Sequence, residues 1–225
     1  MKALIYKELK LAMHPICYVF IAMFPFMILI PSYPLAIGFI YVLSCYPVLF
    51  LGANKGQQSN DLLYSTLLPV RKKDIVLARI FTVIFMQLAF MLIMSALCPV
   101  AMMINANIKT DGGEPLVVPG LGLNSFVLVL AIAIVGYALA DLIFFPIYYK
   151  KGKSIVASTL CTILGFVVYI GVFTIGLPYI PGLEGINHLH IGIQFGVLAF
   201  ALLISFLLHF VVYKVSSKRL EKVDF

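Results

Sequence analysis

Asp141 is the acidic residue that lies deepest inside a long apolar segment, and its carboxylate could clamp helices, bind a substrate or relay a proton. It precedes Lys150 by nine residues, or roughly 13 Å at 1.5 Å per residue. A charge at that depth must face protein or water. Gln87 is a polar residue of the same kind. We expect Asp141 to be a structural clamp that is either neutral or paired with Arg79 or a boundary lysine, with a functional switch or substrate contact as the alternative. Few other ionisable groups share its depth, which argues against a proton-driven pump.

Motifs for hydrolysis and metal binding do not stand out. The sequence lacks H-E-x-x-H, G-x-S-x-G and paired glutamates within an apolar segment, which lowers the expectation of an enzyme. His188 and His190 have Glu184 as their nearby acid, and a zinc site needs three or four ligands. We therefore expect solvated histidines and no metal site. The cysteines are expected to pack as buried thiols: Cys17, Cys45, Cys98 and Cys161.

A nucleotide-binding motif is also missing. Gly152-Lys153-Ser154 resembles the end of a phosphate-binding loop, but that motif requires a glycine five residues before Gly152, where this chain has Ile147. We expect no cofactor on this chain.

The composition indicates an all-α membrane protein. Hydrophobic residues make up 63% of the 225 positions, charged residues 11%, and the mean hydropathy is +1.09. Soluble domains are about half apolar and a quarter charged. Fifteen of the sixteen basic residues fall into four clusters, each separated from the next by two hydrophobic passes. Basic loops stay on the cytoplasmic side of membranes, so the net charge of +7 is interpreted as a topology signal and not as a nucleic-acid surface.

We therefore predict one transmembrane domain over residues 1–225, with both termini in the cytoplasm. An amphipathic helix over 1–14 is expected to lie in the membrane interface, although Glu8 interrupts the edge of its apolar face. Tyr148 and Tyr149 are expected in an aromatic belt. Six spans are predicted at about 15–30, 35–53, 80–104, 124–149, 154–177 and 191–213.

The cytoplasmic loop over 54–79 carries the most specific signal. Ser59 or Asn60 can cap a short helix, which Pro69 ends near Leu68, and Asp74 suits the start of the next helix. The apolar side chains of this short helix must pack against something other than water. A groove of a cytoplasmic partner is one option, and the chain's own interfacial helix or lipid headgroups are the other. These side chains are Leu62, Leu63, Leu67 and Leu68.

The stretch from Asp61 to Arg79, DLLYSTLLPVRKKDIVLAR, resembles the permease subunits of type 2 ABC exporters. Those permeases show a short helix after the second span, followed by a leucine-rich, proline, valine and basic run. The start of the chain, YKELK, and the six spans fit the same family. Among its members, the small permeases that export amphipathic peptides such as phenol-soluble modulins, or confer bacteriocin immunity, look most similar.

This resemblance implies a coupling helix that docks into a cytoplasmic ABC ATPase subunit, which would hold the ATP and Mg²⁺. It also implies a second permease copy, in a homodimer or heterodimer, and a re-entrant hairpin at 178–190. The coupling residues would be Asp61, Leu62, Leu63, Tyr64, Leu67, Leu68, Pro69, Val70 and Arg71.

The resulting hypothesis is a non-enzymatic, multi-pass permease in a bacterial plasma membrane. It would export an amphipathic peptide or a hydrophobic small molecule, with membrane lipid around it and no nucleic-acid partner. The alternative is a stand-alone secondary transporter or membrane sensor. Secondary transporters use repeats and broken helices. Prolines at 25, 47, 99 and 146 could break helices, but no sequence repeat accompanies them.

Overall fold

The computed structural model describes residues 2–12, 15–23, 25–26, 69–107, 125–151, 155–172 and 190–222, and all regular structure within these ranges is helical. The chain begins with α1 (Lys2–Lys7), a π-helical turn η1 (Glu8–Ala12) and α2 (Pro15–Met23). The longer helices are α5 (Lys72–Asn107), α6 (Phe126–Lys151), α7 (Ile155–Gly171) and α8 (Ile191–Glu221).

Three of these helices are long and apolar enough to cross a membrane, over Lys72–Leu97, Phe126–Lys150 and Ile191–Glu221. They correspond to the third, fourth and sixth predicted spans. The fifth corresponds to α7, of which Val156–Gly171 is a shorter apolar helix. The first is represented by α2, and the second, at 35–53, lies outside the described residues together with most of the 178–190 segment. The all-helical membrane class is confirmed, whereas six spans stay a prediction.

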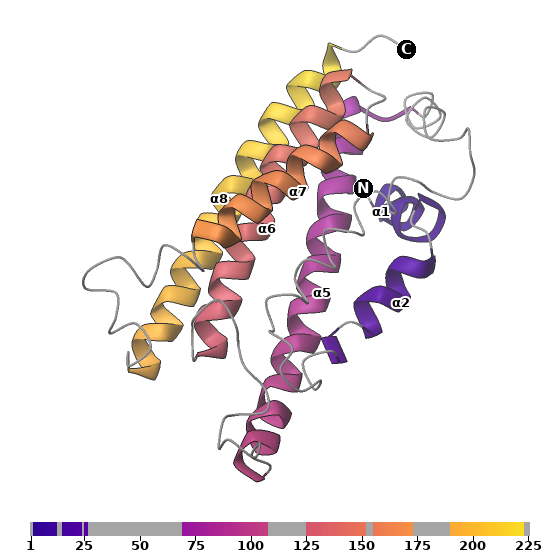
Figure 1. Cartoon of the computed structure of the whole chain (residues 1–225). Coiled ribbons are helices and arrows are strands. Elements are labelled where there is room, and N and C mark those ends of the chain that lie inside the picture. The colour runs from indigo at the N-terminus through magenta and orange to yellow at the C-terminus, as the bar shows by residue number, and fades with distance from the viewer. Residues whose placement is uncertain are drawn as a thin grey trace.

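The packing places α6 at the centre of one group of helices. It packs most extensively against α8 and then against α7, while α5 packs against α8 and carries α1, η1 and α2 on its other side (Figure 1). The start of α5 and the ends of α6 and α8 lie at the same end of the bundle. Their basic residues therefore gather there, as the charge pattern predicts. Which side of the membrane this end faces stays a prediction.

Small residues allow α6 and α7 to approach closely. A Cβ added at Gly136 of α6 would come within 2.9 Å of ring atoms of both Phe166 and Tyr169 in α7. A Cβ added at Gly165 of α7 would collide with Ile143 of α6. Helix association in lipid depends on such close packing, because the surrounding lipid is as apolar as the side chains.

The aromatic end of α6 is buried, contrary to the expected belt. Tyr148 is 3% exposed and Tyr149 is fully buried. Their rings stack on those of Phe144 and Phe145, with centroids 5.8 and 6.2 Å apart. Spacing of four residues places each pair on one face of the helix, and that face is turned toward protein.

Local signals explain the starts of α5 and α8. Helix α5 begins at Lys72, before the position expected from hydropathy, so Asp74 lies in its first turn, where a carboxylate complements the helix dipole. His190 caps α8 by accepting a hydrogen bond from the Gly192 N–H through Nδ1, at 3.2 Å. Both α5 and α6 continue through their internal prolines, Pro99 and Pro146.

Candidate functional site

Asp141 lies at the meeting point of three helices. Its Oδ2 accepts a hydrogen bond from Gln87 Nε2 of α5 at 3.0 Å, and His209 Nε2 of α8 lies 3.0 Å from the same oxygen. Asp141 is fully buried and Gln87 is 5% exposed. The structure therefore places Asp141 and Gln87, the two residues that the sequence indicated as a possible intramembrane polar site, in contact with one another.

The observed contacts of Asp141 are made by residues that sequence reasoning did not name as its partners. Sequence reasoning expected the carboxylate to be neutral or to pair with Arg79 or a boundary lysine, and the structure places Gln87 and His209 beside it. Depth alone suggested a basic residue near the membrane boundary, but the rotation of α5 about its axis directs Arg79 elsewhere. The contact of His209 with Asp141 is an interhelical hydrogen bond between α8 and α6.

The hydrogen bonds of His209 show how a charge is accommodated inside the membrane. Its Nδ1 lies 2.7 Å from the backbone oxygen of Ser205, and its Nε2 faces the carboxylate of Asp141. When the carboxylate is ionised, both of these partners are hydrogen-bond acceptors. An imidazolium, which carries an N–H on each ring nitrogen, then satisfies both of them. The pair then has no net charge, which lowers the cost of placing Asp141 deep in an apolar segment.

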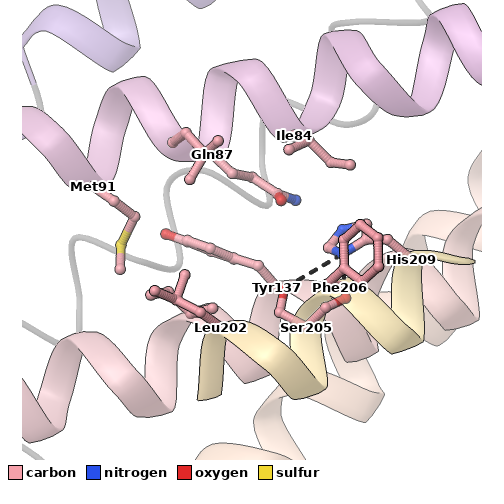
Figure 2. Close-up of a pocket in the computed structure, with 10 residues that line it drawn as sticks. Ile84, Gln87, Met91, Tyr137, Leu202, Ser205, Phe206 and His209 are labelled. Carbon is pink, nitrogen blue, oxygen red and sulfur yellow. Dashed lines mark hydrogen bonds between the residues drawn. The ribbon is translucent and has the colours of Figure 1, made fainter. Parts of the chain in front are cut away.

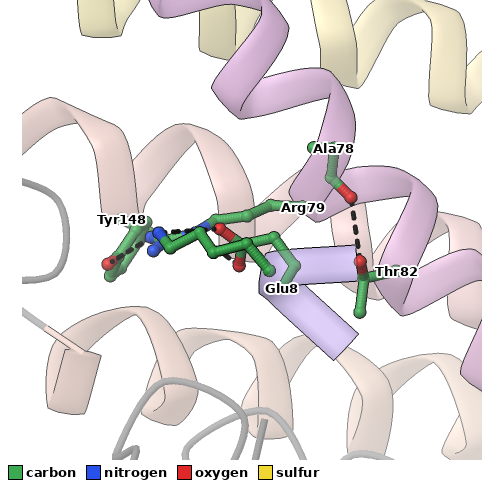
Figure 3. Close-up of polar contacts among 6 residues, drawn as sticks. Glu8, Ala78, Arg79, Thr82 and Tyr148 are labelled. Atoms are coloured by element: carbon green, nitrogen blue, oxygen red, sulfur yellow. Dashed lines mark hydrogen bonds and ion pairs between the residues drawn. The ribbon is translucent and has the colours of Figure 1, made fainter. Parts of the chain in front are cut away.

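A second buried polar cluster joins the N-terminal segment to α5 and α6. Arg79 Nε lies 3.2 Å from Glu8 Oε2, and Arg79 Nη1 donates to the Tyr148 hydroxyl at 3.1 Å (Figure 3). The side chains of Arg79 and Glu8 are 2% and 6% exposed. Lys7 Nζ lies 3.4 Å from the other oxygen of Glu8. The Thr82 hydroxyl, one turn further along α5, donates to the Ala78 carbonyl oxygen and is satisfied locally.

Sequence reasoning missed this cluster. Glu8 was interpreted as an imperfection in an amphipathic helix, and Tyr148 as a residue of an aromatic belt. An acid at the margin of an apolar face is a usable signal, because such a residue needs a cationic partner once the face is covered. The signal does not say which of sixteen basic residues is that partner.

The predicted coupling residues lie mostly outside the described residues. Asp61, Leu62, Leu63, Tyr64, Leu67 and Leu68 belong to that part, whereas Pro69, Val70 and Arg71 immediately precede α5. The side chain of Arg71 is 74% exposed, and its Nε and Nη2 donate to Asp74 at 3.0 and 3.4 Å. These hydrogen bonds raise the pKa of Arg71, which stays protonated. A fixed, exposed guanidinium therefore stands at the start of α5.

Among the described residues, no group of three histidine, cysteine or acidic side chains could hold a metal ion. The polar residues of these helices bind one another and bridge helices. Together with the apolar spans, this arrangement defines an integral membrane protein whose described polar groups serve helix packing.

The family follows from comparison of the whole sequence. The family described as ABC-2 family transporter protein matches residues 3–220, and the chain belongs to that family. It is thus the membrane subunit type of an ABC transporter, a class that normally pairs with an ABC ATPase. No curated protein and no solved structure matches the chain. The family confirms the permease class that the loop sequence indicated, and it leaves the resemblance to peptide exporters as a prediction.

Proposed function

We propose that this chain is the permease subunit of an ATP-driven exporter in a bacterial plasma membrane, with ATP hydrolysed by a separate subunit. The cargo would be an amphipathic peptide or a hydrophobic small molecule, carried between two permease copies. The observation that supports the proposal most is Arg71, because it is exposed, held in place by Asp74 and located where the predicted coupling loop enters α5.

A mechanical path leads from this loop into the membrane. A push on the segment before α5 reaches Arg79 eight residues after Arg71, and Arg79 binds the N-terminal segment through Glu8 and α6 through Tyr148. Eight residues further on, Gln87 binds Asp141, which also contacts α8 through His209. Movement of α5 is therefore coupled to η1, α6 and α8 by hydrogen bonds within the protein.

The cargo class is supported by the apolar character of the exposed surfaces. Large hydrophobic side chains are exposed along α8, including Phe195, Phe200, Phe206 and Phe210. Such a surface can contact lipid, a hydrophobic cargo or a second permease copy. The cargo and the dimer are therefore parts of the proposal.

Co-purification with the ATPase tests the proposal. Arg71→Glu and Leu67→Asp should each abolish association with a soluble ABC ATPase and ATP-dependent export, because they reverse or introduce charge in the coupling segment. Lys214→Glu, at the same end of the bundle but on α8 and outside the coupling segment, is the matched control and should retain association. Normal association and export in both coupling variants would show that the coupling segment lies elsewhere.

A further inference from the structure

A cavity of about 250 Å³ lies between α5, α6 and α8. Met91 and Leu202 line one end, and Gln87, Ser205 and His209 bring polar atoms to the other (Figure 2). Tyr137 of α6 extends across the space between them. Pockets for small molecules combine apolar walls with a few placed polar groups in this way.

The cavity lies at the depth of lipid acyl chains. Helices α5 and α8 run in opposite directions, and both contribute residues to the cavity wall, among them Gln87 and Met91 of α5 and Leu202 and His209 of α8. Ser205 precedes Lys214 by nine residues, or roughly 13 Å. A ligand at this depth needs a hydrophobic body, because the surrounding medium is hydrocarbon.

The polar end selects against charge. Among the described residues that line the cavity there is no lysine, arginine, aspartate or glutamate, and the ring nitrogens of His209 face the Ser205 backbone oxygen and Asp141. A charged headgroup of either sign would leave water for a wall on which the described residues offer no oppositely charged lysine, arginine or carboxylate partner. An uncharged hydroxyl or ester avoids this cost. The Ser205 hydroxyl, 3.3 Å from His209 Nδ1, can donate to such a group or accept from it.

We propose that this cavity binds one alkyl chain that carries a neutral, hydrogen-bonding end group. The chain lies between Met91 and Leu202, and the end group contacts Ser205. This inference goes beyond the proposed export function and concerns the permease chain alone. A single-chain neutral lipid of the membrane and a cargo molecule share this chemistry.

The test is a binding titration of the purified permease, without ATPase, against three ligands of equal chain length: monodecanoylglycerol, decanoate and decylamine. Saturable binding of monodecanoylglycerol is expected, with affinity more than about tenfold above that of either charged ligand, which corresponds to about 1.4 kcal/mol. Equal or tighter binding of decanoate or decylamine, or partitioning without saturation, would overturn the proposal.

Two pairs of variants localise the binding. Leu202→Trp fills the cavity and should abolish saturable binding, whereas Leu203→Trp, at the next position of α8 and outside the cavity lining, should leave it unchanged. Ser205→Ala should reduce the preference for monodecanoylglycerol over decanoate, and Ser95→Ala, at an exposed serine outside the cavity, should preserve it. Equal effects within either pair would contradict the location.

A final measurement assigns the source of the ligand. In proteoliposomes that contain the ATPase, ATP-driven transfer of monodecanoylglycerol between leaflets supports a cargo site, and retention without transfer supports a lipid site. Because binding is measured without the ATPase, failure of ATPase association contradicts only the proposed function, and failure of the titration contradicts only this inference.

Discussion

His209 Nε2 on α8 and Asp141 Oδ2 on α6 lie 3.0 Å apart, inside segments that are otherwise apolar. Gln87 reaches the same oxygen from α5. One carboxylate oxygen therefore connects three helices, and the pair is satisfied as a unit. The energetic value of this unit is accessible by replacing its members singly and together.

Replacing His209 alone should destabilise the protein more than replacing both members of the pair. His209→Leu leaves the Asp141 carboxylate buried with less compensation, at a cost of about 3 kcal/mol or more. The double variant Asp141→Leu with His209→Leu removes the charge as well and should recover most of that loss. Thermal unfolding in detergent measures both. Additive effects of the two single variants would show that the residues are not coupled.

Arg79→Met should separate the N-terminal segment from α5. It leaves Glu8 buried beside Lys7 alone, and removal of one partner of a buried ion pair costs about 3–5 kcal/mol. Increased protease cleavage near the N-terminus and a lowered melting temperature are the expected readouts. Arg71→Met, which removes an exposed partner of Asp74, is the control and should change stability little. Equal loss in both variants would argue against a structural role specific to Arg79.

Gly136→Ala should weaken the packing of α6 against α7. The added methyl meets two aromatic rings at 2.9 Å, and overpacking of this kind costs about 1–3 kcal/mol. Gly196→Ala, where a Cβ meets nothing within 4 Å, should instead be neutral or gain up to about 1 kcal/mol from helix propensity. The comparison is made by thermal unfolding, and a neutral Gly136→Ala would show that the rings move aside without cost.

The orientation in the membrane is testable by cysteine labelling. In a variant without Cys17, Cys45, Cys98 and Cys161, Ser65→Cys should react with an impermeant maleimide in inside-out vesicles and not in intact cells. Gly113→Cys, in a predicted external loop, should show the opposite pattern. Labelling of Ser65→Cys from outside would reverse the predicted topology and remove the basis of the coupling proposal.

Sequence reasoning predicted the long helices better than the contacts between them. Hydropathy and basic clusters located the spans that correspond to α5, α6 and α8, because the apolar composition of each helix is visible in its own sequence. The contacts of Asp141 with Gln87 and His209 were not predicted, because they depend on how the helices are rotated and on their register, which no local pattern encodes. Tyr148 was placed in a belt for the same reason. Its position in the sequence indicates how far along α6 it lies, but not whether its side chain faces lipid or protein.

For the coupling segment, the sequence pattern indicated the family, but the roles of its residues stay untested. Its leucines, proline and basic residue indicated the family by pattern alone, and the family match confirms that class. The roles of Asp61 to Arg71 stay a prediction, because docking into an ATPase is a property of two chains together.

The shared acceptor on Asp141 also constrains how the molecule can move. A slide of α5 or α8 by one helical turn, about 5.4 Å, would part its bridge to α6. Shearing these helices past one another is therefore unfavourable, and they are expected to tilt as one rigid block during the proposed transport movement. Changes in helix packing during that movement are then expected at the surfaces where other segments contact α5, α6 and α8.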